Sequence, residues 1–264
     1  GTTSAVSLTV TSGSTVVAPA ALTLYGNYAN SGTVTHTNST TTLAGSHIQT
    51  LSGNMTGSHA FDNLSITNTY ATVTPAIVFA ANASTTGTLT MEASTSAQFL
   101  ASGMYTFQDI NLRGMAKKPI TLRSSTPSTQ FTFNVPGTQV KANYVDVKDS
   151  TACATTITVS NGTNSGNNNC WTFQTVSSIS GRLFSDAGDS PIGTTKTLKL
   201  AMGTTTTRTY TTMTVGLGDW EFLLTDGYSF ATATRLLVWV DGDATTPASV
   251  FTKASGTAPI LDLD

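Results

Sequence analysis

Short apolar segments separated by Gly, Asn and Ser turns run along most of this chain. Early examples are residues 8–10, 22–28 and 32–34, where apolar and hydroxyl-bearing residues alternate. Alternation with a period of two is typical of β-strands, because successive side chains point to opposite faces. Thr and Val also favour strands over helices. With no amphipathic helical pattern in view, the sequence predicts an all-β protein of many short strands.

The apolar segments recur as similar phrases. Residues 60–66, 87–91, 105–112 and 119–122 repeat an apolar segment that often carries Asn beside Leu or Ile. A strand-turn unit of roughly 20 to 30 residues cannot bury its apolar face alone, so such units stack into a solenoid. We therefore predict a right-handed parallel β-helix; the alternative is a large antiparallel sandwich of the same strands. The predicted inward residues are Leu64, Ile66, Leu89, Phe107, Ile110, Leu112, Ile120, Leu122, Phe131, Phe133, Val140, Tyr144, Val145 and Val147.

The repeated phrases stop after residue 173, and a short polar link follows at residues 174–178. We place a domain boundary there, which gives a β-solenoid over residues 1–174 and a second domain over residues 179–264. About five or six strand-like segments with intervening turns make up the second domain, a pattern that predicts an Ig-like or prealbumin-like β-sandwich.

Charged residues form only 10% of the chain, against about 25% in a typical soluble domain. The net charge is -2, and we interpret the twelve Lys and Arg as scattered singly apart from Lys117-Lys118. This distribution predicts neither nucleic acid nor an anionic membrane as a partner. No apolar run is long enough for a transmembrane segment. The start at Gly1 without a signal-peptide pattern suggests that any such peptide has been removed.

The two cysteines, Cys153 and Cys170, flank a turn-rich run at residues 160–169. This spacing would let two neighbouring strands be joined, so we predict a disulfide and an extracellular location. The alternative is a pair of free thiols.

Five Asn-x-Ser/Thr sequons begin at Asn38, Asn54, Asn63, Asn82 and Asn161. They are candidate N-glycosylation sites, which would place them on the surface of a secreted protein. A composition this rich in Asn, Ser and Thr also produces such triplets by chance.

Residues 24–34, 48–53 and 61–66 read LYGNYANSGTV, IQTLSG and FDNLSI. This pattern resembles the β-helical repeats of very large bacterial surface proteins of the adhesin type. The segments 144–150 and 167–173 are similar to those that close the solenoid in such proteins. Residues 180–186, 218–222 and 240–243 resemble carboxypeptidase-regulatory-like sandwiches of the same proteins.

The resemblance implies an extracellular structural or adhesive protein, either a subunit of a surface fibre or a segment of a giant adhesin, and it brings no catalytic residues. Two features depart from the pattern. The cysteine pair is absent from it, and the chain stops at residues 260–264, where related modules continue into another strand. We therefore expect an open sheet edge that accepts a strand from another copy or from a neighbouring surface-protein domain.

Candidate catalytic residues are few. A glycosidase needs two carboxylates about 5 to 9.5 Å apart, but Glu92 and Glu221 lie in different modules. The Asp residues lie mostly in turn segments, at residues 186–189, 225–227 and 241–243. Asp146 and Asp149 are closer together, but we do not expect them to form a catalytic pair. We expect no catalytic site, and so a protein that is not an enzyme.

Candidate metal ligands are equally sparse. His36, His47 and His59 could stack on successive turns, although we interpret them as solvated surface residues. The Asp186/Asp189 and Asp241/Asp243 pairs lack the spacing of an EF-hand loop. We expect neither a metal nor a cofactor.

The alternative function is a carbohydrate-binding or polysaccharide-active β-helix protein that recognises glycans. Trp171, Trp220 and Trp239 could form a sugar-stacking platform, but we interpret them as core residues.

Overall fold

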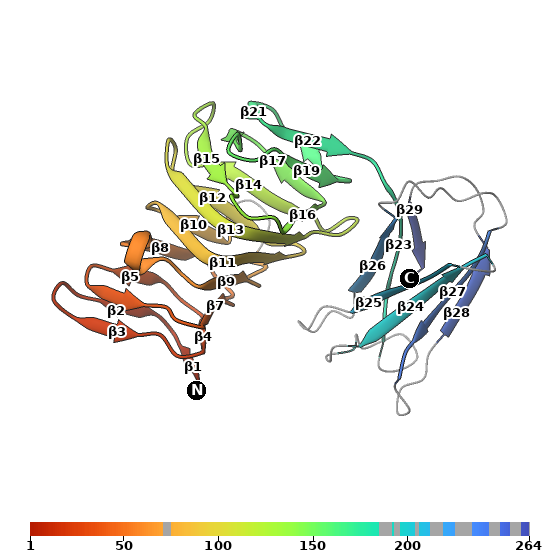
Figure 1. Cartoon of the computed structure of the whole chain (residues 1–264), viewed down its shortest axis with the longest axis horizontal. Coiled ribbons are helices and arrows are strands. Elements are labelled where there is room, and N and C mark those ends of the chain that lie inside the picture. The colour runs from red at the N-terminus through yellow and green to blue at the C-terminus, as the bar shows by residue number, and fades with distance from the viewer. Residues whose placement is uncertain are drawn as a thin grey trace. The chain divides into compact units, whose positions relative to one another are not determined.

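The structure is a computed structural model that describes residues 1–70, 75–184, 192, 196–203, 206–211, 219–224, 234–242, 249–253 and 260–263. The chain forms two compact units, Gly1–Gln174 and Thr175–Asp264. The first unit is a β-solenoid of about eight turns, drawn from red to green in Figure 1. All ladders between its named strands are parallel. This confirms the predicted solenoid and excludes an antiparallel sandwich for the described residues of this unit.

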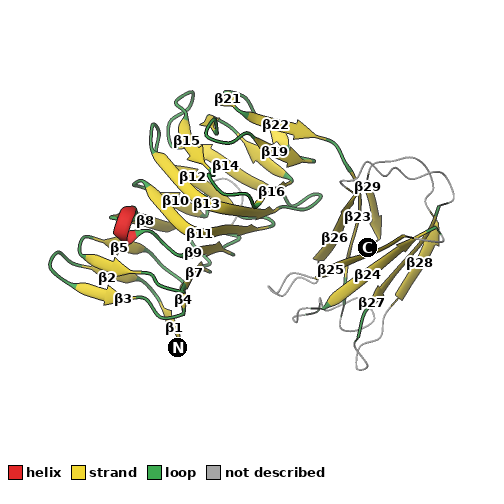
Figure 2. Ribbon diagram, viewed as in Figure 1, coloured by secondary structure: helices red, strands yellow, loops and turns green. Residues whose placement is uncertain are grey.

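Two long parallel sheets and one short one form the faces of the solenoid (Figure 2). The first sheet contains, in order, β1 (Thr2–Ala5), β4 (Ala21–Leu24), β7 (Thr40–Leu43), β9 (Asn63–Ile66), β11 (Ala83–Glu92), β13 (Met104–Arg113), β15 (Phe131–Asn134), β18 (Ser150–Thr151) and β21 (Asn168–Asn169), with a branch from β13 through β16 (Val140–Asn143), β19 (Ile157–Ser160) and β22 (Trp171–Gln174). The second sheet contains β2 (Leu8–Val10), β5 (Tyr28–Asn30), β8 (Gln49–Gly53), β10 (Ile77–Phe79), β12 (Ser96–Phe99), β14 (Ile120–Ser124), β17 (Val145–Val147) and β20 (Thr163–Asn164). The short sheet pairs β3 (Thr15–Val17) with β6 (Thr33–Thr35), and a single 3-10 turn, η1, covers Gly57–His59.

Alternate residues of each strand point into the solenoid or out of it. Along β14, for example, Ile120 and Leu122 are buried, whereas Thr121 and Arg123 are half-buried and point outward. All of the predicted inward side chains are buried except Val140, which is half-buried against the core. A column of aromatic rings lies at the centre, where Phe99 stacks on Phe79 and Phe131 with ring centroids 4.9 and 4.5 Å apart. Burial of this continuous apolar column is the main force that holds the turns together.

Side chains at the corners tie each turn to the next. The Asn27 carboxamide, for instance, accepts a hydrogen bond from the Thr50 amide at 2.8 Å. Gly53 follows with a φ of +83°, and a Cβ on this residue would lie 2.0 Å from the carbonyl oxygen of Asn30. Only glycine fits such a close approach at a left-handed backbone position.

The second unit contains two sheets. One has the order β26 (Asp219–Leu224), β23 (Ser177–Arg182), β29 (Ile260–Leu263), and the other has the order β25 (Thr206–Thr211), β24 (Thr197–Met202), β27 (Arg235–Val240), β28 (Ser249–Lys253). Pairing is antiparallel except between β23 and β29. Apolar residues from both sheets, among them Ile179, Trp220, Leu200 and Val238, form one buried cluster. Nowhere in the described part of the chain is a helix long and apolar enough to cross a membrane.

Candidate functional site

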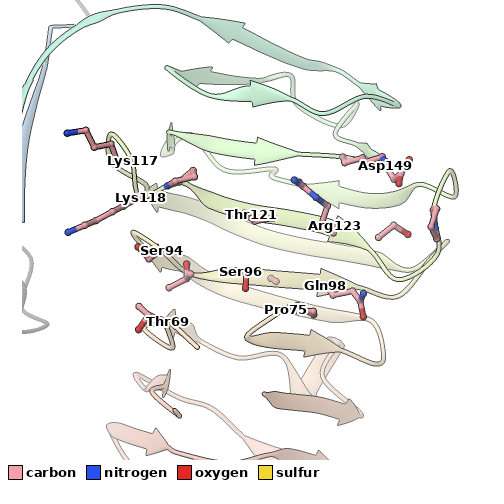
Figure 3. A pocket seen from close by; sticks show the side chains of 16 residues that line it. Thr69, Pro75, Ser94, Ser96, Gln98, Lys117, Lys118, Thr121, Arg123 and Asp149 are labelled. Atoms are coloured by element: carbon pink, nitrogen blue, oxygen red, sulfur yellow. The ribbon is translucent and has the colours of Figure 1, made fainter. Parts of the chain in front are cut away.

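A cleft of about 660 Å³ lies on the outer surface of the second sheet of the solenoid, over β12 and β14. Because the apolar residues of these strands point inward, the alternate residues form the cleft floor. Ser96 and Gln98 come from β12, and Thr121 and Arg123 come from β14. The ladder places Ser96 beside Thr121 and Gln98 beside Arg123. Figure 3 shows these two rows of polar side chains.

Lysines border the cleft. Lys117 and Lys118 lie at the end where β14 begins (Figure 3), and Lys148 lies just after β17. A tight turn presents the first two, since Met115 and Lys118 exchange both backbone hydrogen bonds and Lys117 has a φ of +62°. Lys117 and Lys148 are exposed, and Lys118 is half-buried. The cleft therefore combines cationic rims with a hydroxyl- and amide-bearing floor.

Arg123 is held in place by the neighbouring turn. Its Nη2 donates to the Asp146 carboxylate at 2.6 Å, and its Nη1 donates to the carbonyl oxygens of Leu122 and Asp146 at 2.9 and 2.8 Å. Asp146 also accepts a hydrogen bond from the Ser165 hydroxyl at 2.6 Å. These contacts fix the orientation of the guanidinium group and compensate its charge.

Asp149 lies at the end of the cleft away from Lys117 and Lys118 (Figure 3) and is only 3% exposed. Its carboxylate accepts from the Asn167 side-chain amide at 2.8 Å, and its φ of +60° places it at a corner. Asp149 therefore lies at a corner of the solenoid, whereas Asp146 lies within β17 and pairs with Arg123.

The charge of the solenoid is unevenly distributed. Among residues 1–174, every Lys and Arg lies between residues 113 and 148, where six basic residues accompany a single acidic one, Asp146. The preceding 112 residues contain neither Lys nor Arg. The basic residues of this unit stand singly apart from Lys117-Lys118, as interpreted, but they are confined to this one segment. This asymmetry is visible in the sequence and was the available signal for the cleft.

The predicted disulfide between Cys153 and Cys170 is confirmed, with a Cα–Cα separation of 5.0 Å. It connects the turn after β18 to the start of β22. The final turns of the solenoid are thus joined covalently.

The five candidate glycosylation sites differ in accessibility. Asn38, Asn54 and Asn82 are exposed, whereas Asn63 and Asn161 are half-buried. The Asn161 side-chain amide donates to the Tyr144 hydroxyl at 3.0 Å, although this nitrogen is the atom to which a glycan would be attached.

The Asn63 and Asn82 side chains each accept a backbone N–H from the following turn, Thr88 at 2.9 Å and Met104 at 2.9 Å. These two asparagines, like Asn161, therefore have a structural role at the corners.

The three histidines lie in different surroundings. His47 stacks on Tyr70, whereas His36 packs on Phe61 with ring centroids 4.9 Å apart. Burial lowers the pKa of His36 to about 4, an effect that the negative charge of Asp62 opposes. The interpretation of His36 as a solvated surface residue was wrong, because the aromatic side chains around it could not be located from the sequence. No group of three or more His, Cys, Asp or Glu in the described residues is arranged to hold a metal ion.

Other candidates are placed as follows. Trp171 and Trp220 are buried in the cores of their units, and Trp239 is half-buried. Asp241 pairs with Lys199 at 2.9 Å. Asp186, Asp189 and Asp243 lie outside the described residues.

With these contacts in view, we compared the chain with known proteins. No protein-family model, curated protein or solved structure matches it. The function is therefore inferred from the side chains of this chain and their contacts.

Proposed function

We propose that this chain is a non-enzymatic extracellular protein of the cell surface with a structural and adhesive role, either as a subunit of a fibre or as a segment of a large adhesin. The observation that supports this most is the single apolar core that runs through the solenoid. The Cys153–Cys170 disulfide also links the last turns of the solenoid covalently. A rigid rod of stacked turns suits a spacer, and a structural disulfide suits an oxidising environment outside the cell.

The acidic residues of the solenoid support a role without catalysis. Each of the five carboxylates in residues 1–174 has a structural contact. Asp62 accepts from the Ser39 amide at 3.0 Å, for example, and Glu92 pairs with Arg113. Carboxylates held in this way stabilise turns and are poorly suited to proton transfer in an open cleft.

The finer features of the fold belong to the same proposal: a right-handed solenoid followed by an Ig-like sandwich of the regulatory-domain type. Partners would be copies of the chain or neighbouring surface domains, joined by strand addition at an edge such as β26 or β28. Asn38 and Asn54 are the sequons best placed to carry glycans, because both are exposed.

Surface labelling tests this proposal. Antibodies against the native protein are expected to label intact source cells, and negative-stain electron microscopy of the released material is expected to show fibres or long surface appendages. Labelling that appears only after permeabilisation of the cells would refute the extracellular role. Surface labelling with dispersed particles would favour a segment of an adhesin over a fibre subunit.

A second candidate function is carbohydrate binding, and the cleft over β12 and β14 favours it. Its floor of Ser96, Gln98 and Thr121 offers hydroxyl and amide groups, which suit the many hydroxyls of a sugar as both donors and acceptors. An array of glycans probed with the intact protein tests this candidate. An array without any signal would exclude it for the sugars displayed.

A further inference from the structure

We propose that the cleft over β12 and β14 binds an acidic polysaccharide, with the lysines at its rims contacting the carboxylates of the sugar. This inference deepens the second candidate function, carbohydrate binding, and depends on it. It adds the chemical class of the ligand and the residues that select it.

Charge supports an acidic ligand. Residues 113–149 carry six basic residues and two acidic ones, Asp146 and Asp149, in a chain whose net charge is -2, and Asp149 lines one end of the cleft. Arg113 pairs with Glu92, and Arg123 pairs with Asp146. Lys117, Lys118 and Lys148 border the cleft, and Lys141 does not. A concentration of cations at one cleft raises the local concentration of anionic ligands.

The floor of the cleft has a regular geometry. Adjacent strands of a sheet lie about 4.8 Å apart, so outward side chains repeat at that interval along the solenoid. One row runs through Ser96, Thr121, Asp146 and Thr163 on four successive turns. A polymer lying along the axis would meet the Ser96 and Thr121 hydroxyls, which line the cleft, and then the Asp146 carboxylate, which is paired with Arg123.

The spacing along each strand separates the residues at the two ends of the cleft. From Lys118 to Arg123 the chain extends by roughly 16 Å at the rise of a β-strand. The turn that carries Lys117 and Lys118 therefore lies about one strand length from Arg123 across the floor. Arg123 is already oriented by Asp146, so its remaining N–H groups add fixed donors at little cost in conformational entropy.

A nucleic acid is the alternative polyanion for this cleft. Proteins that bind single strands usually combine cations with aromatic rings on which bases stack. None of the described residues that line this cleft is aromatic. Hydroxyls and an amide form the floor instead, and these favour sugar hydroxyls over base faces.

The test measures binding of the full chain to α-1,4-linked hexagalacturonate by calorimetry, with its fully methyl-esterified form as the matched neutral ligand. Three proteins are compared with the wild type: Lys148→Gln, the triple variant Lys117→Gln with Lys118→Gln and Lys148→Gln, and Lys141→Gln. Lys141 is the control, because it is an exposed lysine on β16 that lies outside the cleft. Circular dichroism and hydrogen exchange verify that each variant folds.

We expect the acidic hexasaccharide to bind and its ester to bind at least tenfold more weakly. Removing one exposed charge contact lowers an affinity by about 1.5- to 5-fold, so Lys148→Gln should fall in that range and the triple variant should lose about tenfold or more. Lys141→Gln should bind as the wild type does. Salt at about 0.5 M should weaken the interaction, because it screens exposed charges.

Three results would overturn the proposal. The first is absence of hexagalacturonate binding, or equal binding of acid and ester. The second is an unchanged affinity in both the single variant and the folded triple variant. The third is tighter binding of an oligothymidylate of 20 nucleotides, lost in the triple variant, which would assign the cleft to nucleic acid.

Failure of this inference is distinguishable from failure of the functions above. A protein that labels the cell surface but binds neither ligand keeps its structural role. A protein that binds neutral glycans at the cleft keeps the second candidate function and refutes only the acidic class.

Discussion

Phe99 gives the most direct test of how the solenoid is stabilised. Its side chain is fully buried, and four aromatic rings surround it: Phe79, Tyr105, Phe131 and Phe133, with centroids 4.9, 4.7, 4.5 and 5.8 Å away. Replacement by Ala removes the ring and leaves a cavity among neighbours that cannot close it. Such changes cost about 3 to 5 kcal/mol, and the four ring contacts place Phe99→Ala near the upper end.

The effect should be local, because each turn of a solenoid contacts only its neighbours. Hydrogen exchange with mass spectrometry on the full chain is therefore the suitable assay. Peptides that cover β10 to β15 should lose about 4 kcal/mol of protection, whereas those of β1 to β6 should lose much less.

Two further variants sharpen the test. Phe99→Leu fills most of the space and should cost about 1 to 2 kcal/mol. Leu100→Ala changes the next residue, whose side chain is 42% exposed, and should stay within about 0.5 kcal/mol of the wild type. A loss below about 2 kcal/mol for Phe99→Ala, or a uniform loss over all turns, would refute the stacked-core explanation.

Three other predictions concern the corners, the disulfide and pH. Gly53→Ala should cost at least about 2 kcal/mol of stability, because it adds a clash to a left-handed backbone. Gly57→Ala, with a φ of +59° and open space around it, should cost only about 1 kcal/mol. Equal costs in urea unfolding would contradict this. Replacing Cys153 and Cys170 together by Ser should cost about 3 kcal/mol of stability for a separation of 17 residues. The loss is measured as reduced hydrogen-exchange protection in β19 and β22. Unchanged protection there would contradict this prediction. Burial lowers the pKa of His36 to about 4 in the folded protein, from an ordinary value of about 6.5. The unfolded state therefore binds more protons between these pH values. The free energy of unfolding should decrease by about 1 to 2 kcal/mol as the pH falls from 7 to 4, a figure reduced for partial exposure. His36→Gln should flatten this part of the pH profile and exposed His47→Gln should not; equal slopes in all three proteins would rule out His36 as the cause.

The fold was largely predictable because a solenoid repeats a local pattern. Each turn buries its own alternate residues, so Leu64, Ile110 and Leu122 could be placed inside from the sequence alone. The disulfide was predictable for a similar reason, since Cys153 and Cys170 flank a single turn-rich segment. Pattern and spacing were sufficient where the contacts are between successive turns.

The cleft was not predictable in the same way. It depends on which outward residues meet across turns, and the register varies with the length of each loop. Contacts between successive turns join residues 20 apart in one case and 30 apart in another. The placement of Lys117 and Lys148 on the border of one cleft results from that register. For His36, the relevant neighbour, Phe61, also comes from a later turn.

The parallel pairing of successive turns has a consequence for how the protein is made. Most contacts between turns close loops of only 20 to 30 residues. Closing such loops costs far less entropy than joining distant strands, and low contact order speeds folding. The chain can therefore add one turn at a time as it emerges from the ribosome, with the growing end as the template for the next strand.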